Sequence, residues 1–160
     1  MTTADPIMTR ITQGVTDFRT GEVDRARTAL LETWADIGVT GDPLHRCTLA
    51  HYLADTYDDP AEALVWDVRA LDAADALTDT RLNDHHAGLQ VAGFYPSLHL
   101  NLADNFRRLG AFPAATRHIE AARERLHTLG DDDYGDTIRR ALTEVATAVT
   151  VGDTTRRPTH

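Results

Sequence analysis

The sequence predicts an all-α protein of about seven helices. Apolar residues recur at steps of three and four along most of the 160 residues, which is the period of a helix with one buried face. Gly, Pro and Asp interrupt this pattern at short intervals and divide it into segments of helical length. No alternating run of β-branched and aromatic residues is long enough to suggest a sheet. The length suits a single domain whose core needs no disulfide or metal to hold it together.

Two helix pairs are expected in the first half of the chain, at residues 6–37 and 43–77. Within the first pair, the apolar pattern pauses at Gly21, a residue type that commonly ends helices. The second pair begins at Pro43 and restarts at Pro60, and an Asp precedes each of these prolines. Because Asp caps helix starts and Pro is tolerated in the first turn, both positions predict the beginning of a helix.

The second half predicts a third pair at residues 95–129 and a capping helix at 133–149. Pro96 is expected to start this pair and Gly110 to divide it. The residues between the second and third pairs fit at most a short helix around 82–89.

Polar segments flank the capping helix on both sides. Three consecutive acidic residues, Asp131 to Asp133, lie at its start, and we interpret them as caps because calcium needs more oxygen ligands than three adjacent carboxylates offer. Residues 151–160 lack an apolar stripe and are predicted to form a flexible tail.

The composition excludes several classes of function. The net charge of −9 argues against a surface for nucleic acid, which requires clustered positive charge. The chain contains no Lys, which excludes Schiff-base enzymes and nucleotide binding by a GxxxxGK[ST] loop. With Cys47 as the single cysteine, neither an intrachain disulfide nor a multi-thiolate zinc site can form. Neither a secretory signal nor a membrane span is recognisable, so we expect a cytoplasmic protein.

Residues 98–129 carry small, aromatic and apolar residues at characteristic positions of a helix pair. These positions are Leu102, Ala103, Phe106, Gly110, Phe112, Ala115, Ile119 and Ala122. The pattern resembles a tetratricopeptide repeat, although His99 stands where that family often has Trp. The two earlier pairs match the same pattern with gaps, so that the resemblance covers about 120 residues. The Arg-only composition, rich in Ala, Asp and Thr, is typical of GC-rich bacteria.

The resemblance implies a right-handed stack of helix pairs that binds a protein or peptide in a concave groove. The groove residues carried over from the family are Thr48, His51, Asp55, Asp58, Ser97, Leu100, Asn101, Asp104, Arg107 and Arg108. They do not reproduce the Lys, Asn and Arg clamp with which some members hold a peptide carboxylate. Arg107 and Arg108 either pair with an anion or form a solvated face at a helix end.

These observations favour an interaction or scaffold module without a cofactor over an enzyme. The acidic chain favours a neutral or basic partner, steered by charge at low salt. Nucleic acid and membrane partners are not expected, and the sequence leaves homo-oligomerisation open.

The histidines support an alternative function in metal or small-ligand binding, or in catalysis within a specialised bacterial pathway. His51 and Asp55 are four residues apart and would share one face of a helix, and His99 would lie on a neighbouring helix. Imidazole and carboxylate groups of this kind ligate zinc, iron or nickel. In the simpler interpretation, these side chains pack or face solvent, and Cys47 is a buried hydrophobic residue.

Overall fold

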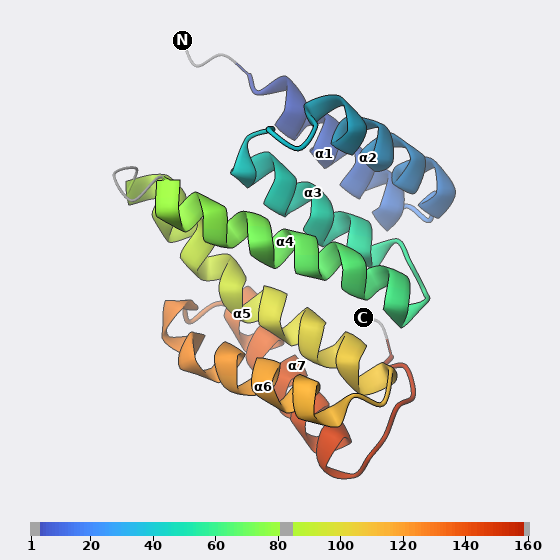
Figure 1. Ribbon diagram of the computed structural model, residues 1–160, viewed down its shortest axis with the longest axis vertical. Helices are drawn as coiled ribbons and strands as arrows, with labels where there is room; N and C mark the ends of the chain where they lie inside the picture. Colours follow the sequence, from blue (N-terminus) through green and yellow to red (C-terminus); the bar gives the residue numbers. More distant parts are fainter. Residues whose placement is uncertain (1–3, 81–84, 159–160) are drawn as a thin grey trace. The chain divides into compact units, whose positions relative to one another are not determined.

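The computed structural model describes residues 4–80 and 85–158, with side chains described over 4–77 and 93–158. Within these residues the protein consists of seven α-helices and one turn of 3₁₀-helix, without a strand (Figure 1). The all-α fold predicted from the sequence is therefore confirmed. No helix in the described part of the chain is long and apolar enough to cross a membrane. The helices are α1 (Pro6–Arg19), α2 (Val23–Ile37), α3 (Pro43–Asp55), α4 (Pro60–Thr80), α5 (His85–Arg108), α6 (Phe112–Glu124) and α7 (Asp133–Thr150), with η1 (Leu126–Thr128) before α7.

The chain divides into two compact units, Met1–Leu77 and Thr78–His160. The first holds α1 to α3 and most of α4. The second holds α5, α6 and α7.

In the first unit, α1 and α2 form an antiparallel hairpin against which α3 packs. The chain reverses at Gly21, whose φ of +91° is accessible to glycine at little cost. The two helices approach closely, because a Cβ atom added at Gly14 would lie 2.7 Å from the Leu30 side chain. On α4, Trp66 meets Trp34 of α2 edge-on, with ring centroids 5.1 Å apart. This aromatic contact joins α4 to the first hairpin.

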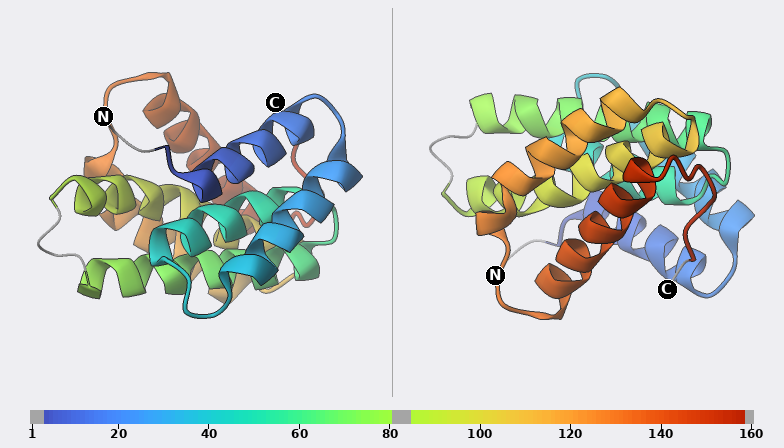
Figure 2. Two further views of the ribbon diagram at one scale, coloured as in Figure 1. Left: turned by 90° about the horizontal axis from the view of Figure 1, so that it is seen from above. Right: turned by 90° about the horizontal axis from the view of Figure 1, so that it is seen from below.

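The second unit repeats this arrangement with α5, α6 and α7. Gly110, with a φ of +75°, reverses the chain between α5 and α6, and the Ala111 N–H donates to the Phe106 carbonyl at 2.8 Å. Figure 2 shows α7, in red, crossing the α5–α6 pair, and it contacts both helices. The core between them consists of Leu100, Ala103, Ile119, Ala122, Leu129, Ile138, Ala141, Leu142 and Val145.

Helix α5 starts earlier than the sequence predicts. The start predicted at Pro96 is wrong, because α5 already begins at His85 and continues through this proline. Proline lacks the N–H that would continue the helical hydrogen bonds, yet Pro96 is buried between the buried side chains of Tyr95 and Leu98. Burial of this apolar segment outweighs the local preference of proline for the first turn. Residues 82–84 of the predicted short helix lie outside the described residues.

The segment after α7 is bound to the second unit rather than free of it. Gly152, with a φ of +71°, turns the chain, and the Asp153 N–H donates to the Ala148 carbonyl at 2.9 Å. Arg107 of α5 donates from Nη1 to the Asp153 carbonyl at 2.7 Å, and Arg157 pairs with Glu144 of α7 at 2.6 Å. These bonds correct the prediction of a flexible tail for the described residues 151–158.

Candidate functional site

The predicted groove residues on α3 differ in their exposure. Thr48 is buried, and its hydroxyl donates to the Leu44 carbonyl at 2.8 Å. His51 is half-buried, whereas Asp55 at the end of α3 and Asp58 after it are exposed. The residues of this set that a partner of the first unit can reach are therefore His51, Asp55 and Asp58.

His51 is held in an environment that disfavours its charged form. Burial lowers the pKa of His51, and the negative charge of Asp55 acts in the opposite direction. The Nδ1 atom of His51 is buried and has no hydrogen-bond partner in the described part of the chain. This imidazole is therefore poorly solvated and favours its neutral form.

On α5, two predicted groove residues lie in the protein interior. Leu100 belongs to the core between α5, α6 and α7, and Ser97 is also buried. Leu100 was expected to line an open groove, and its apolar side chain instead packs against the helices of its own unit. Asn101 and Arg108 are partly exposed.

Arg107 forms an ion pair inside the second unit and does not face an open groove. Its side chain is 0% exposed and contacts Asp104 Oδ1 through Nε at 2.9 Å and Nη2 at 2.8 Å. The third contact is the Asp153 carbonyl described above. Both alternatives predicted for Arg107, pairing with a partner's anion and a solvated face, are wrong for this structure, because the side chain is buried and an intramolecular carboxylate and carbonyl occupy the guanidinium.

The metal-binding alternative combined residues of both units. His51 and Asp55 lie in the first unit and His99 in the second, and the described residues contain no group of three or more His, Cys, Asp or Glu side chains arranged to hold a metal ion.

Cys47 is unsuited to nucleophilic chemistry. Its side chain is buried in the first unit. Burial, with a smaller contribution from the charge of Asp75, raises the pKa of the Cys47 thiol to about 12. The reactive thiolate is therefore almost absent at neutral pH.

A pair of histidines that the sequence did not predict lies in the second unit. His99 of α5 and His118 of α6 face each other with their Nδ1 atoms 3.1 Å apart. Both side chains are half-buried. The two residues lie 11 positions before and 8 positions after Gly110, so the hairpin turn brings them side by side. The position of the two histidines on either side of this glycine is a sequence signal that points to the pair.

One aromatic ring stacks on each of the two histidines. Tyr95 stacks on His99 with centroids 6.2 Å apart, and Phe106 stacks on His118 at 5.5 Å. The Arg125 guanidinium lies 4.0 Å from the centroid of the Tyr95 ring. Burial, followed by the charge of Arg117, lowers the pKa of His118. The neutral imidazole of His118 is therefore favoured at neutral pH.

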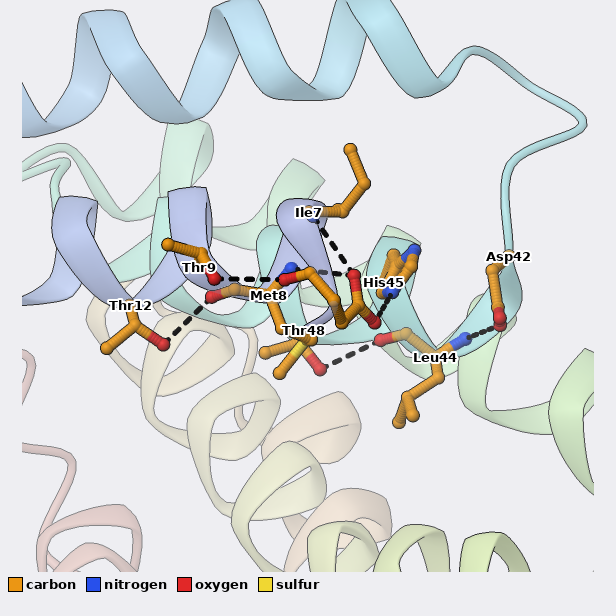
Figure 3. A network of polar contacts seen from close by, with 9 residues as sticks. Ile7, Met8, Thr9, Thr12, Asp42, Leu44, His45 and Thr48 are labelled. Atoms are coloured by element: carbon orange, nitrogen blue, oxygen red, sulfur yellow. Dashed lines mark hydrogen bonds and ion pairs between the residues drawn. The ribbon is translucent and has the colours of Figure 1, made fainter. Parts of the chain in front are cut away.

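A cluster of polar contacts joins the starts of α1 and α3 in the first unit (Figure 3). Asp5 caps α1 by accepting from the N–H groups of Ile7 at 3.0 Å and Met8 at 3.1 Å. Its second carboxylate oxygen lies 2.7 Å from Nε2 of His45 on α3. The hydrogen bond from His45, followed by that from the Met8 N–H, lowers the pKa of Asp5. Since both groups are engaged in capping and pairing, this cluster has a structural role.

Comparisons with known proteins identify no relative of this chain. No protein-family model matches it, and neither a curated protein nor a solved structure is significantly similar.

Proposed function

We propose that the protein is an interaction or scaffold module that binds a protein or peptide partner through its helical surface. The observation that carries this proposal is the repeated arrangement of the two units. In each unit an antiparallel helix pair, α1–α2 or α5–α6, is followed by a third helix, α3 or α7, that contacts both members of the pair. Repeated helix pairs of this kind present extended surfaces for binding.

The charge and exposure of the predicted groove residues indicate the chemistry of the partner. Asp55 and Asp58 on the first unit are exposed, and Asn101 and Arg108 on the second are partly exposed. Together with the net charge of −9, this set favours a neutral or basic partner. Leu100 and Arg107 are buried inside the second unit, so they would stabilise its fold and would not contact the partner.

The chemistry of the remaining side chains supports a binding function rather than catalysis. Cys47 is buried, and its thiol stays protonated at neutral pH. The Asp104 carboxylate is engaged by Arg107, and the Asp5 carboxylate by His45 and two N–H groups. Engaged groups of this kind are poor candidates for acid–base work on a substrate.

Affinity capture with the tagged protein, compared between matched variants, tests this proposal. The double variant Asp55→Asn/Asn101→Ala changes one candidate residue in each unit. Glu120→Gln, at an exposed position on α6, removes the same amount of negative charge elsewhere. We expect a partner to be retained by the wild type and by Glu120→Gln, and to be depleted with the double variant. Equal retention by all three proteins would contradict binding through these residues.

A further inference from the structure

We propose that His99 and His118 form a two-imidazole binding site for a divalent late transition-metal ion such as Zn²⁺. This inference is independent of the proposed interaction function. It rests on the position of the two Nδ1 atoms, which come from different helices of one hairpin and lie 3.1 Å apart.

The separation of the two nitrogen atoms matches that of two ligands of one metal ion. A zinc–imidazole bond is about 2.0–2.1 Å long, so two imidazole nitrogens in a tetrahedral site are about 3.3 Å apart. The distance in the protein differs from this value by about 0.2 Å, which a small rotation of either ring can supply. The ring centroids are 5.3 Å apart, so the two Nδ1 atoms point almost directly at each other, and each ring has to turn for its lone pair to face a shared ion.

The protonation of the pair also suits metal binding. At 3.1 Å, the Nδ1–H of one ring donates a hydrogen bond to Nδ1 of the other, so the accepting ring carries its own proton on Nε2. When an ion binds, the donor ring moves its proton to Nε2, and both Nδ1 lone pairs face the metal. Two neutral imidazoles bind the ion without net proton release.

The surroundings position the rings and leave the ion accessible. Tyr95 stacks on His99, and Phe106 stacks on His118. Because both histidines are only half-buried, water can complete the coordination shell. The net charge of −9 favours cations overall, whereas Arg117 beside His118 weakens their binding locally. A site with two protein ligands should consequently bind more weakly than a closed structural zinc site.

Calorimetric titration of the purified, untagged protein with Zn²⁺ tests the site. A background of about 5 mM Mg²⁺ occupies the oxygen-ligand sites that Mg²⁺ prefers. His99→Phe and His118→Phe keep an aromatic ring in the stack but remove the ligand nitrogen. His127→Ala removes an exposed histidine from η1 of the same unit and serves as the matched control.

We expect about one Zn²⁺ per chain for the wild type and for His127→Ala. Either Phe variant should lose about tenfold or more in affinity, since even a change of a residue behind a ligand costs that much. Absence of saturable binding by the wild type, or equal affinities for wild type and Phe variants, would overturn the proposal.

Thermal unfolding with and without Zn²⁺ distinguishes a lost site from a damaged fold. An ion that binds only the folded state raises the unfolding temperature. We expect this rise for the wild type and His127→Ala, and a smaller rise for both Phe variants, which should keep the helical circular dichroism of the wild type. A rise of the same size in His118→Phe would contradict the site.

Discussion

Small side chains at the helix crossings determine how closely the helices of each unit approach. Ala103 and Ala115 are both 0% exposed, on α5 and α6. The sequence placed both residues at the closest contact of a helix pair, through the resemblance to a repeat family. Their complete burial agrees with that placement.

Replacing Ala115 by Leu should therefore overpack the α5–α6 contact. We expect Ala115→Leu to lower the free energy of unfolding by about 1–3 kcal/mol, because the surrounding core has no room for the larger side chain. Ala35→Leu on the exposed face of α2 is the control and should change stability by less than about 0.5 kcal/mol. Urea unfolding measures both, and equal effects would show that Ala115 is not at a tight crossing.

The contact between Asp5 and His45 should make the free energy of unfolding depend on pH in the acidic range. The folded protein lowers the pKa of Asp5 from its ordinary value of 3.8, so this carboxylate stabilises the fold above that value. The contribution is lost as the pH falls through the lowered pKa.

Unfolding of the wild type and of Asp5→Ala at neutral pH and near pH 2 measures this dependence. We expect the wild type to be the more stable protein at neutral pH and the difference to shrink in acid. A difference independent of pH would mean that the carboxylate charge is not involved.

Among the elements, the two hairpins owe their turns to glycines at positive φ. The sequence predicted Gly21 and Gly110 as helix ends, because this residue type alone adopts that conformation cheaply. The early start of α5 could not be predicted in the same way. Its Pro96 carries a local signal for a helix start, and only the burial of the surrounding segment overrides that signal.

Two glycine substitutions, one inside α5 and one in the turn that follows it, isolate the energetic cost of a positive φ. A Cβ atom at Gly110 or at Gly93 would meet nothing within 4 Å, but only Gly110 has a positive φ. We expect Gly110→Ala to destabilise the protein by about 1–2 kcal/mol. Gly93→Ala, inside α5, should stabilise it by about 0.5–1 kcal/mol. Thermal unfolding of both variants checks the opposite signs, and a loss of stability in both would contradict this account.

Arginine side chains secure the ends of several elements. Arg46 donates to the Gly38 carbonyl at the end of α2 at 2.6 Å while stacking over Trp34, and Arg27 donates to the Thr56 carbonyl after α3. Arg107 does the same for the segment after α7 through the Asp153 carbonyl. A guanidinium group donates in several directions at once, which suits these contacts in a chain without Lys.

Removal of the segment after α7 should destabilise the second unit. Deletion of residues 153–160 removes the carbonyl that Arg107 binds and the ion pair between Arg157 and Glu144. Because a buried donor loses its acceptor, we expect a loss of about 1–3 kcal/mol. The sequence, which shows only a polar tail, predicts no change. Deleting 159–160 removes none of these contacts and is the control, and equal melting temperatures for the two truncations would support the sequence-based expectation.

At the scale of the whole molecule, the sequence predicted the candidate site less well than the helices. Apolar periodicity and the Gly, Pro and Asp signals depend on neighbouring residues, which is why the helices could be predicted. The burial of Leu100 and Arg107 depends on how α7 and the segment after it fold back, and no local pattern encodes this. The His99–His118 pair likewise depends on the register of α5 against α6.

The central claim is that this protein is an interaction module. The most direct test is to measure how a captured and purified partner binds to it. Calorimetric titration would compare the wild type, Asp55→Asn/Asn101→Ala and Glu120→Gln at about 50 mM and 500 mM salt. The account predicts saturable binding by the wild type that weakens at high salt, a loss of about tenfold in the double variant and near-wild-type affinity for Glu120→Gln. No saturable binding by the wild type, or equal affinities for all three proteins, would contradict it.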